Sequence, residues 1–79
     1  MSSVASLVLE IVRRLVDNPD AVEVHEVDGE ASRIIEVSVD KDDVGKVIGR
    51  QGRTAYAIRT LVYAVSGKDK KRTVLQILD

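Results

Sequence analysis

The first part of the chain has the apolar periodicity of an amphipathic helix. Apolar residues recur three and four positions apart at Val4, Leu7, Val8, Ile11, Val12 and Leu15. Ser2 or Ser3 stands where a helix N-cap is favoured, and Pro19 ends the pattern because the residue before a proline avoids helical angles. We therefore predict an N-terminal helix that ends within residues 17–20.

Two extended segments, residues 21–28 and 32–39, follow this helix. Apolar residues alternate along both segments, although the alternation of the first breaks at Glu26-Val27. Asp28-Gly29 between the segments is typical of a hairpin turn. The positions that this pattern turns inward are Val22, Val24, Ile35, Val37 and Val39. The two segments are therefore predicted to be antiparallel strands.

Two helices and a third strand complete the pattern. Residues 44–48 are predicted to form a short helix, in which Gly45 is expected to permit close packing because glycine otherwise weakens a helix. A longer helix follows Gly52 and stops near Gly67. Its predicted core positions are Ala55, Ile58, Leu61, Val62 and Val65. Residues 73–78 are almost continuously apolar, which favours a strand covered on both faces.

The predicted elements follow one another in the order α-β-β-α-α-β. The hairpin makes the first two strands antiparallel, and the helical crossover makes the second and third strands parallel. The fold class is therefore α+β, with a three-stranded mixed sheet covered by three helices. No linker or internal repeat divides the chain, so residues 1–79 are expected to form one domain.

Composition leaves few candidates for catalysis or metal binding. The 79 residues contain no cysteine and one histidine, so we expect no disulfide, metal site, cofactor or catalytic residue. No apolar run is long enough to span a bilayer, which makes the cytoplasm the expected location. A domain of this size has a marginal core unless a partner extends it.

Charge is distributed unevenly along the chain. Residues 1–40 hold three Arg and nine acids, a balance of −6, whereas residues 41–79 hold nine Lys or Arg and four acids, a balance of +5. The sum is the net charge of −1. This asymmetry favours a polyanion as the partner of the basic half, although two solvated faces of opposite sign would produce the same count.

A glycine-bracketed turn joins the last two predicted helices. Gly49 and Gly52 can adopt backbone angles closed to other residues, and the helix that follows offers unpaired N–H groups and its dipole to an anion. Arg50 and Arg53 beside it favour a phosphate. The Walker and Rossmann patterns are absent, whereas Gly49-Arg50-Gln51-Gly52 resembles the G-x-x-G loop with which KH domains clamp single-stranded nucleic acid. The alternative is a helix–helix corner that uses glycine only for its geometry.

A longer resemblance is carried by residues 15–20, 42–55 and 57–59, which read LVDNPD, DDVGKVIGRQGRTA and AIR. These stretches are similar to the small stand-alone bacterial KH proteins of the KhpA (YlqC) family, and the likeness covers nearly the whole chain. It implies the type II, prokaryotic arrangement of the KH fold in a cytoplasmic RNA-binding protein that is not an enzyme. It also implies a homodimer, or a heterodimer with another KH-containing protein. Tyr56 departs from the pattern, because a basic residue and a phosphate contact are expected there.

The favoured function is single-stranded RNA binding by an RNA chaperone or post-transcriptional regulator. The predicted RNA-binding residues are Lys46, Val47, Ile48, Gly49, Arg50, Gln51, Gly52 and Arg53. A protein-interaction adaptor with a degenerate KH fold is the second hypothesis. A phosphoryl-transfer or nucleotide enzyme is the third and least favoured hypothesis, because no loop, histidine or metal-ligand cluster organises the carboxylates.

The chain has no Phe or Trp on which bases could stack, so aliphatic side chains are the candidate walls of a base-binding groove. The candidates are Val44, Val47, Ile48, Ile35 and Val37. The alternative interpretation is that all five only pack in the hydrophobic core.

Two helix faces are candidate partner surfaces because they carry surplus apolar area. One is a flank of the first helix, formed by Ala5, Leu9, Val12 and Val16. The other is a stripe on the long helix, formed by Tyr56, Arg59, Thr60 and Tyr63 at helical spacing. Tyrosine and arginine on an outward face are typical of interfaces.

Overall fold

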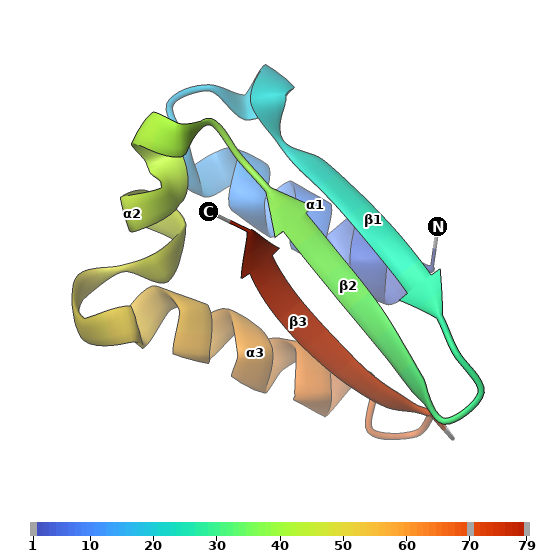
Figure 1. Cartoon of the computed structure of the whole chain (residues 1–79). Coiled ribbons are helices and arrows are strands. Elements are labelled where there is room, and N and C mark those ends of the chain that lie inside the picture. Colours follow the sequence, from blue (N-terminus) through green and yellow to red (C-terminus); the bar gives the residue numbers. More distant parts are fainter. Residues whose placement is uncertain (1, 70, 79) are drawn as a thin grey trace.

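The computed structural model describes residues 2–69 and 71–78, and its elements follow the predicted order (Figure 1). The helices are α1 (Ser3–Leu15), α2 (Val44–Ile48) and α3 (Arg53–Val65). The strands are β1 (Glu23–Asp28), β2 (Ser32–Ser38) and β3 (Arg72–Leu78). Single 3₁₀ turns lie at Pro19–Ala21, Lys41–Asp43 and Arg50–Gly52. β1 therefore starts two residues later than predicted, because the turn that Pro19 begins extends through Ala21.

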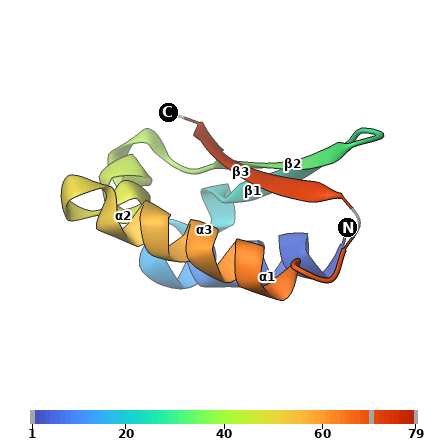
Figure 2. The same ribbon diagram turned by 90° about the horizontal axis from the view of Figure 1, so that it is seen from below.

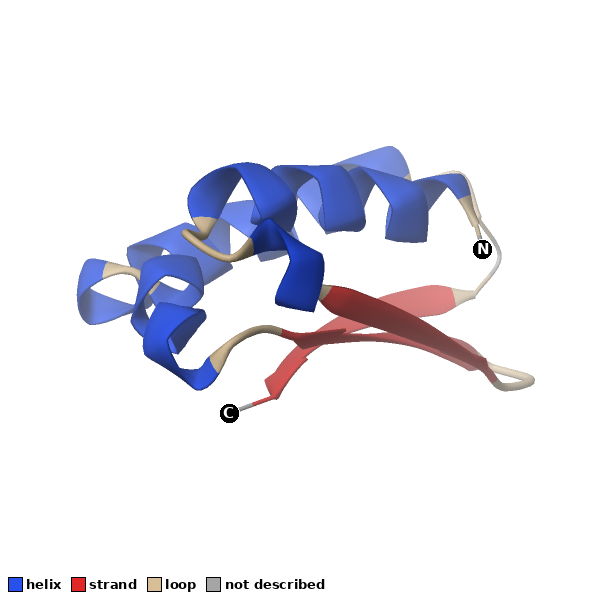
Figure 3. Ribbon diagram, turned by 90° about the horizontal axis from the view of Figure 1, so that it is seen from above, coloured by secondary structure: helices blue, strands red, loops and turns tan. Residues whose placement is uncertain are grey.

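The sheet has the strand order β1-β2-β3, and the predicted directions are confirmed. β1 pairs with β2 antiparallel, and β2 pairs with β3 parallel, so that Ile35 lies opposite Glu26 on one side and Leu75 on the other. All helices cover the same face of the sheet (Figures 2 and 3). The prediction that β3 is covered on both faces is therefore wrong. Its apolar run instead places Val74 and Leu78 on the open face, where both are partly accessible.

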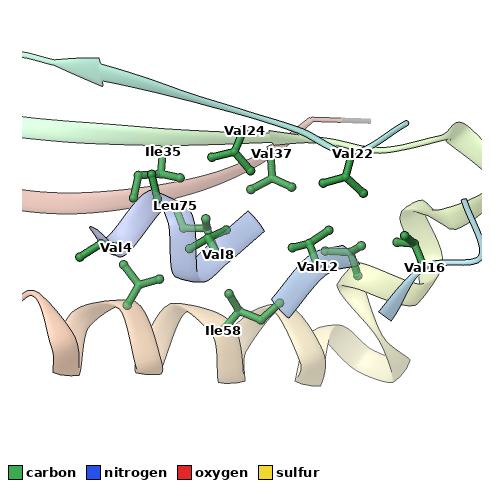
Figure 4. Close-up of a cluster of buried hydrophobic side chains, with 13 residues drawn as sticks. Val4, Val8, Val12, Val16, Val22, Val24, Ile35, Val37, Ile58 and Leu75 are labelled. Carbon is green, nitrogen blue, oxygen red and sulfur yellow. The ribbon is translucent and has the colours of Figure 1, made fainter. Parts of the chain in front are cut away.

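The hydrophobic core lies between this sheet and the helices (Figure 4). Ile35 and Val37 of β2 and Leu75 of β3 point from the sheet toward Val8 of α1 and Ile58 of α3. The most deeply buried large side chains are Ile35, Val8, Val12, Val37, Val47 and Val62. Dense aliphatic packing of this kind is the main source of stability in a domain without disulfides.

The covered face of α1 is rotated from the predicted one toward Ala5 and Val16. Ser2 is the N-cap, and its hydroxyl accepts a hydrogen bond from the N–H of Ala5 at 3.1 Å. Leu7 and Leu15 are exposed, at 39% and 38%, although the sequence pattern assigned them to the core. Conversely, the flank of α1 that was predicted to contact a partner is covered by the protein itself. Its residues Ala5, Val12 and Val16 are buried in the core and Leu9 packs against it.

The covered face of α3 is narrower than predicted. Ala55, Ile58 and Val62 are buried, as expected, but Leu61 and Val65 are 49% and 43% exposed. The reason is position: α3 lies at the side of the helical layer, where the sheet and α1 cover only part of its circumference (Figure 2).

Gly45 in α2 was predicted to permit close packing, but it does not, because a Cβ atom there would meet nothing within 4 Å.

Candidate nucleic-acid interface

The glycine-bracketed loop, residues 49–52, is a single turn that redirects the chain from α2 into α3 (Figure 1). Gly49 has φ 78° and ψ 172°, Gln51 has φ 57° and Gly52 has φ 75°. The N–H of Gly49 donates to the carbonyl of Gly45 at 2.8 Å, and the N–H of Gly52 donates to that of Gly49 at 3.1 Å. Three residues with positive φ within four positions produce this sharp corner.

Each glycine meets a different requirement. A Cβ atom on Gly49 would lie 2.8 Å from the backbone nitrogen of Thr54 and would overlap the Thr54 side chain, so both space and φ demand glycine. A Cβ atom on Gly52 would meet nothing, and only its φ favours glycine. Gln51 adopts the left-handed region with a full side chain, at a cost of roughly 1–2 kcal/mol. Strain of this kind is often kept at ligand-binding turns.

The start of α3 is suited to an anion. Its N-cap, Gly52, has no side chain to satisfy the first N–H groups, and its first turn contains no acidic residue. Arg50, Gln51 and Arg53 are exposed around it. The positive end of the helix dipole and two guanidinium groups therefore face solvent together, as phosphate binding requires.

Lys46 and Val47 face away from this anion site. The Nζ atom of Lys46 lies 3.2 Å from a carboxylate oxygen of Asp17 and 3.4 Å from one of Asp43. The hydrogen bond to Asp17, together with the one to Asp43, raises the pKa of Lys46. The Lys46 ammonium group is therefore already paired with two carboxylates. Val47 is completely buried, so it cannot touch a ligand and instead fixes α2 to the core.

Only part of the predicted base-binding groove is accessible. Ile35 and Val37 are buried in the hydrophobic core, which agrees with the alternative interpretation that they only pack there. Ile48 is 37% exposed and Val44 is half-buried on α2. Gly45 lies between them in sequence and leaves open space where a side chain would stand. These three residues form a small apolar surface immediately before the loop.

Asp43 anchors the base of the site, and the sequence interpretation missed this role. Its buried carboxylate accepts hydrogen bonds from the backbone N–H groups of Asp17 and Asn18, at 3.3 and 3.0 Å. Burial alone would raise the pKa of Asp43, but these bonds and the ion pair with Lys46 outweigh it and lower the pKa. The end of α1 is thereby fastened to the start of α2. An acidic residue directly before a helix is the only sequence signal, and it reads equally well as an N-cap.

The stripe of Tyr56, Arg59, Thr60 and Tyr63 on α3 is accessible, but two of its side chains are hydrogen-bonded within the chain. Tyr56 and Tyr63 are 72% and 48% exposed. The Thr60 hydroxyl donates to the carbonyl of Tyr56 at 3.0 Å, and Arg59 Nε donates to the carbonyl of Leu75 in β3 at 3.5 Å. The stripe therefore lies on the side of α3 that borders the edge strand.

Within residues 2–69 and 71–78, His, Asp and Glu side chains nowhere gather in a group of three that could hold a metal ion. The helices of this part of the chain are too short or too polar to cross a membrane.

Comparison with known proteins gives one family. The family described as KhpA/KhpB, KH domain, matches residues 5–77. Relatives named RNA-binding protein KhpA include that of Caldanaerobacter subterraneus subsp. tengcongensis, 58% identical over 72 residues, or 91% of this chain and 96% of the relative. The one from Halalkalibacterium halodurans is 54% identical over 74 residues, 94% of this chain and 97% of the relative. The one from Aquifex aeolicus is 47% identical over the full length of both chains. No solved structure matches the chain.

Proposed function

Because the chain belongs to the KhpA/KhpB family of KH-domain proteins, we propose that it binds single-stranded RNA through the loop at residues 49–52. The observation that carries this proposal is the start of α3, which has no side-chain cap, no acidic residue in its first turn, and exposed Arg50 and Arg53 beside it. Relatives are named for RNA binding and the family is not one of enzymes. RNA as ligand agrees with the expected cytoplasmic location.

In the proposed complex, phosphates occupy the anion site and bases lie on the neighbouring apolar surface. The N–H of Arg53 already donates to the carbonyl of Arg50, so the N–H groups that follow it in the first turn of α3 donate to phosphate oxygens. The two guanidinium groups add charge-assisted hydrogen bonds. Ile48, Val44 and the bare backbone at Gly45 accept the face of an unstacked base. A duplex hides its base faces, so this arrangement favours single strands. Contacts dominated by phosphate give little base preference, which suits an RNA chaperone or post-transcriptional regulator.

The test is the double variant Arg50→Asp/Gln51→Asp. Both side chains are exposed, so the fold should survive while two carboxylates repel the phosphate, and we expect RNA binding to be lost. The matched control is Ser6→Asp/Arg13→Asp, which changes the net charge by the same −3 on exposed positions of α1. Fluorescence anisotropy with an unstructured RNA compares the two variants, and thermal melts verify folding. Wild-type affinity in a folded loop variant would refute the proposal.

We further propose that two copies of the chain associate through the outward face of α3. Ala57, Leu61, Ala64 and Val65 are exposed there, and this arc of the helix contains no charge. Small residues beside one leucine allow two helices to approach closely, and an uncharged stripe is self-complementary about a twofold axis. Leu9 and Val16 do not contribute to this surface, because Val16 is buried and Leu9 is half-buried against the core. Another KH-containing protein is the alternative occupant, and the adaptor hypothesis depends on it.

Sedimentation at high micromolar concentration tests this association. We expect a dimer for the wild type and a monomer for Leu61→Asp. Tyr56→Ser/Tyr63→Ser probes the other exposed stripe of the same helix and should remain dimeric. A monomeric wild type would exclude self-association, whereas a monomeric tyrosine variant would move the interface to the stripe first predicted.

A further inference from the structure

A hollow lies at the end of α3 opposite the glycine loop. It has a volume of about 490 Å³ and is formed by the last turn of α3, the following connector and the start of β3. In Figure 1 these segments lie at the far end of the helix from α2. The pocket is therefore separate from the anion site, although both border the same helix.

The charged groups of this pocket leave a positive balance. Asp69 lines it, but an oxygen of its carboxylate lies 3.5 Å from a guanidinium nitrogen of Arg33. Lys71 is paired with Asp28 at 2.7 Å. Arg72 also lines the pocket, is exposed, and makes no ion pair within the described part of the chain. The uncompensated charge is thus a guanidinium group, which favours an anionic ligand.

A polar atom without a partner lies in the same pocket. Thr73 is 3% exposed, and its hydroxyl oxygen has no hydrogen-bond partner in the described part of the chain. Buried hydroxyl groups are normally paired, so an orphan at a pocket wall indicates a ligand group or a water that completes it. Tyr63 supplies a half-exposed ring at the same wall. A ring, a guanidinium and an unpaired hydroxyl match the base, phosphate and sugar of a nucleotide.

We propose that this pocket is a second nucleotide subsite, filled by the same RNA strand that the glycine loop holds. The inference rests on the proposed function and extends it to a longer ligand. α3 has 13 residues and spans roughly 20 Å, a distance covered by about six stacked nucleotides. Tyr56 and Tyr63 are seven positions apart on the flank of α3 that borders β3, so their rings form two steps along this path.

Two lengths of oligouridine, 4 and 10 nucleotides, separate the two sites. Tyr63→Ala/Arg72→Glu should weaken binding of the longer RNA about tenfold, since one stacking and one phosphate contact are lost, and leave the shorter RNA unaffected. Thr73→Val removes only the orphan hydroxyl, should keep the fold, and should weaken the longer RNA alone. Arg13→Glu is the control for charge. The loop variant Arg50→Asp/Gln51→Asp should lose both lengths.

The outcomes separate this inference from the proposed function. If the loop variant loses both RNAs while the pocket variants bind the longer one as the wild type does, the subsite is refuted and the proposed function stands. If the loop variant retains both RNAs, the proposed function itself fails. If Tyr63→Ala changes sedimentation and leaves the affinity for the longer RNA unchanged, the pocket is a protein contact and the inference is overturned.

Discussion

Gly49 and Gly52 look equivalent in the sequence, but their surroundings make very different demands. Gly49 lies against Thr54 and has a φ, ψ pair open only to glycine, whereas Gly52 has free space and an ordinary left-handed conformation. The motif letters record neither difference, because both depend on how the start of α3 folds back over the turn.

We expect Gly49→Ala to lower the free energy of unfolding by about 3 kcal/mol, since backbone strain and overlap with Thr54 add. Gly52→Ala should cost only about 1 kcal/mol, the penalty for one left-handed alanine. Urea unfolding of both variants beside the wild type measures the difference. Equal losses would mean that the turn relaxes away from Thr54 when a methyl group is added.

Single side chains of the site were predictable in type but not in orientation. Arg50 and Arg53 were expected at the surface and lie there. Val47 and Ile48 are adjacent aliphatic residues in a helix of five residues, which is too short for periodicity to separate the buried one from the exposed one. The pairing of Lys46 with Asp17 joins positions 29 apart, and such contacts are invisible to local pattern.

At the scale of elements, α2 is held in place largely by Asp43. The short helix cannot be stable alone, because helices of so few residues lack the length that offsets nucleation. Its orientation, and that of the glycine loop, therefore follows from packing of Val47 and from the hydrogen bonds that join Asp43 to residues 17–18.

This anchor predicts a specific dependence of stability on pH. The pKa of Asp43 in the folded protein lies below its usual value of 3.8, so the carboxylate stabilises the fold above that pH and loses this contribution as pH falls through the lower folded value. Asp43→Asn should be less stable than the wild type at pH 7, and the gap should narrow below pH 3.8. Urea unfolding across this range measures the gap. A gap that is constant with pH would assign the loss to geometry and not to charge.

The wild type alone does not isolate Asp43, because two other carboxylates respond in the same direction. The pKa of Glu26 is lowered chiefly by hydrogen bonds from Ser2, and that of Asp28 by the hydrogen bond from Lys71. Only the difference between the variant and the wild type reports on the anchor of α2.

The elements themselves were largely readable from the sequence, because their order and directions follow from period, turn residues and crossover length. The covered arc of each helix was not. Leu61 lies three positions after Ile58, a spacing that is typical of a core residue, but it is exposed because α1 packs against only one side of α3. Which side of a helix its neighbours cover is decided by tertiary packing and cannot be predicted from local sequence.

At the scale of the molecule, the separation of charge governs how the protein meets a polyanion. The half of the chain that carries the loop has a balance of +5, although the whole molecule is slightly negative. Attraction is therefore concentrated on the surfaces formed by residues 41–79, from the loop to the connector after α3, whereas the surfaces formed by residues 1–40 repel RNA that approaches them.

We expect a moderate salt dependence of RNA binding. With about three phosphates neutralised at the loop, the single-strand relation gives a slope near −2 for the logarithm of affinity against the logarithm of salt concentration. Anisotropy titrations between about 50 and 200 mM salt determine the slope. A slope near zero, or equal affinity for duplex RNA, would contradict phosphate contact by a single-strand groove.

The parallel pairing of β2 with β3 sets an order of events during synthesis. Ile35 lies opposite Leu75, 40 positions later, so the sheet closes only after α2, the glycine loop and α3 have all been made. Loop-closure entropy opposes this late pairing, and until it occurs the core lacks one wall. We therefore expect a growing chain on the ribosome to carry its RNA-binding turn in an unsupported form. On the proposed function, we expect such a chain to bind the messenger that encodes it only after residues 72–78 have emerged and folded.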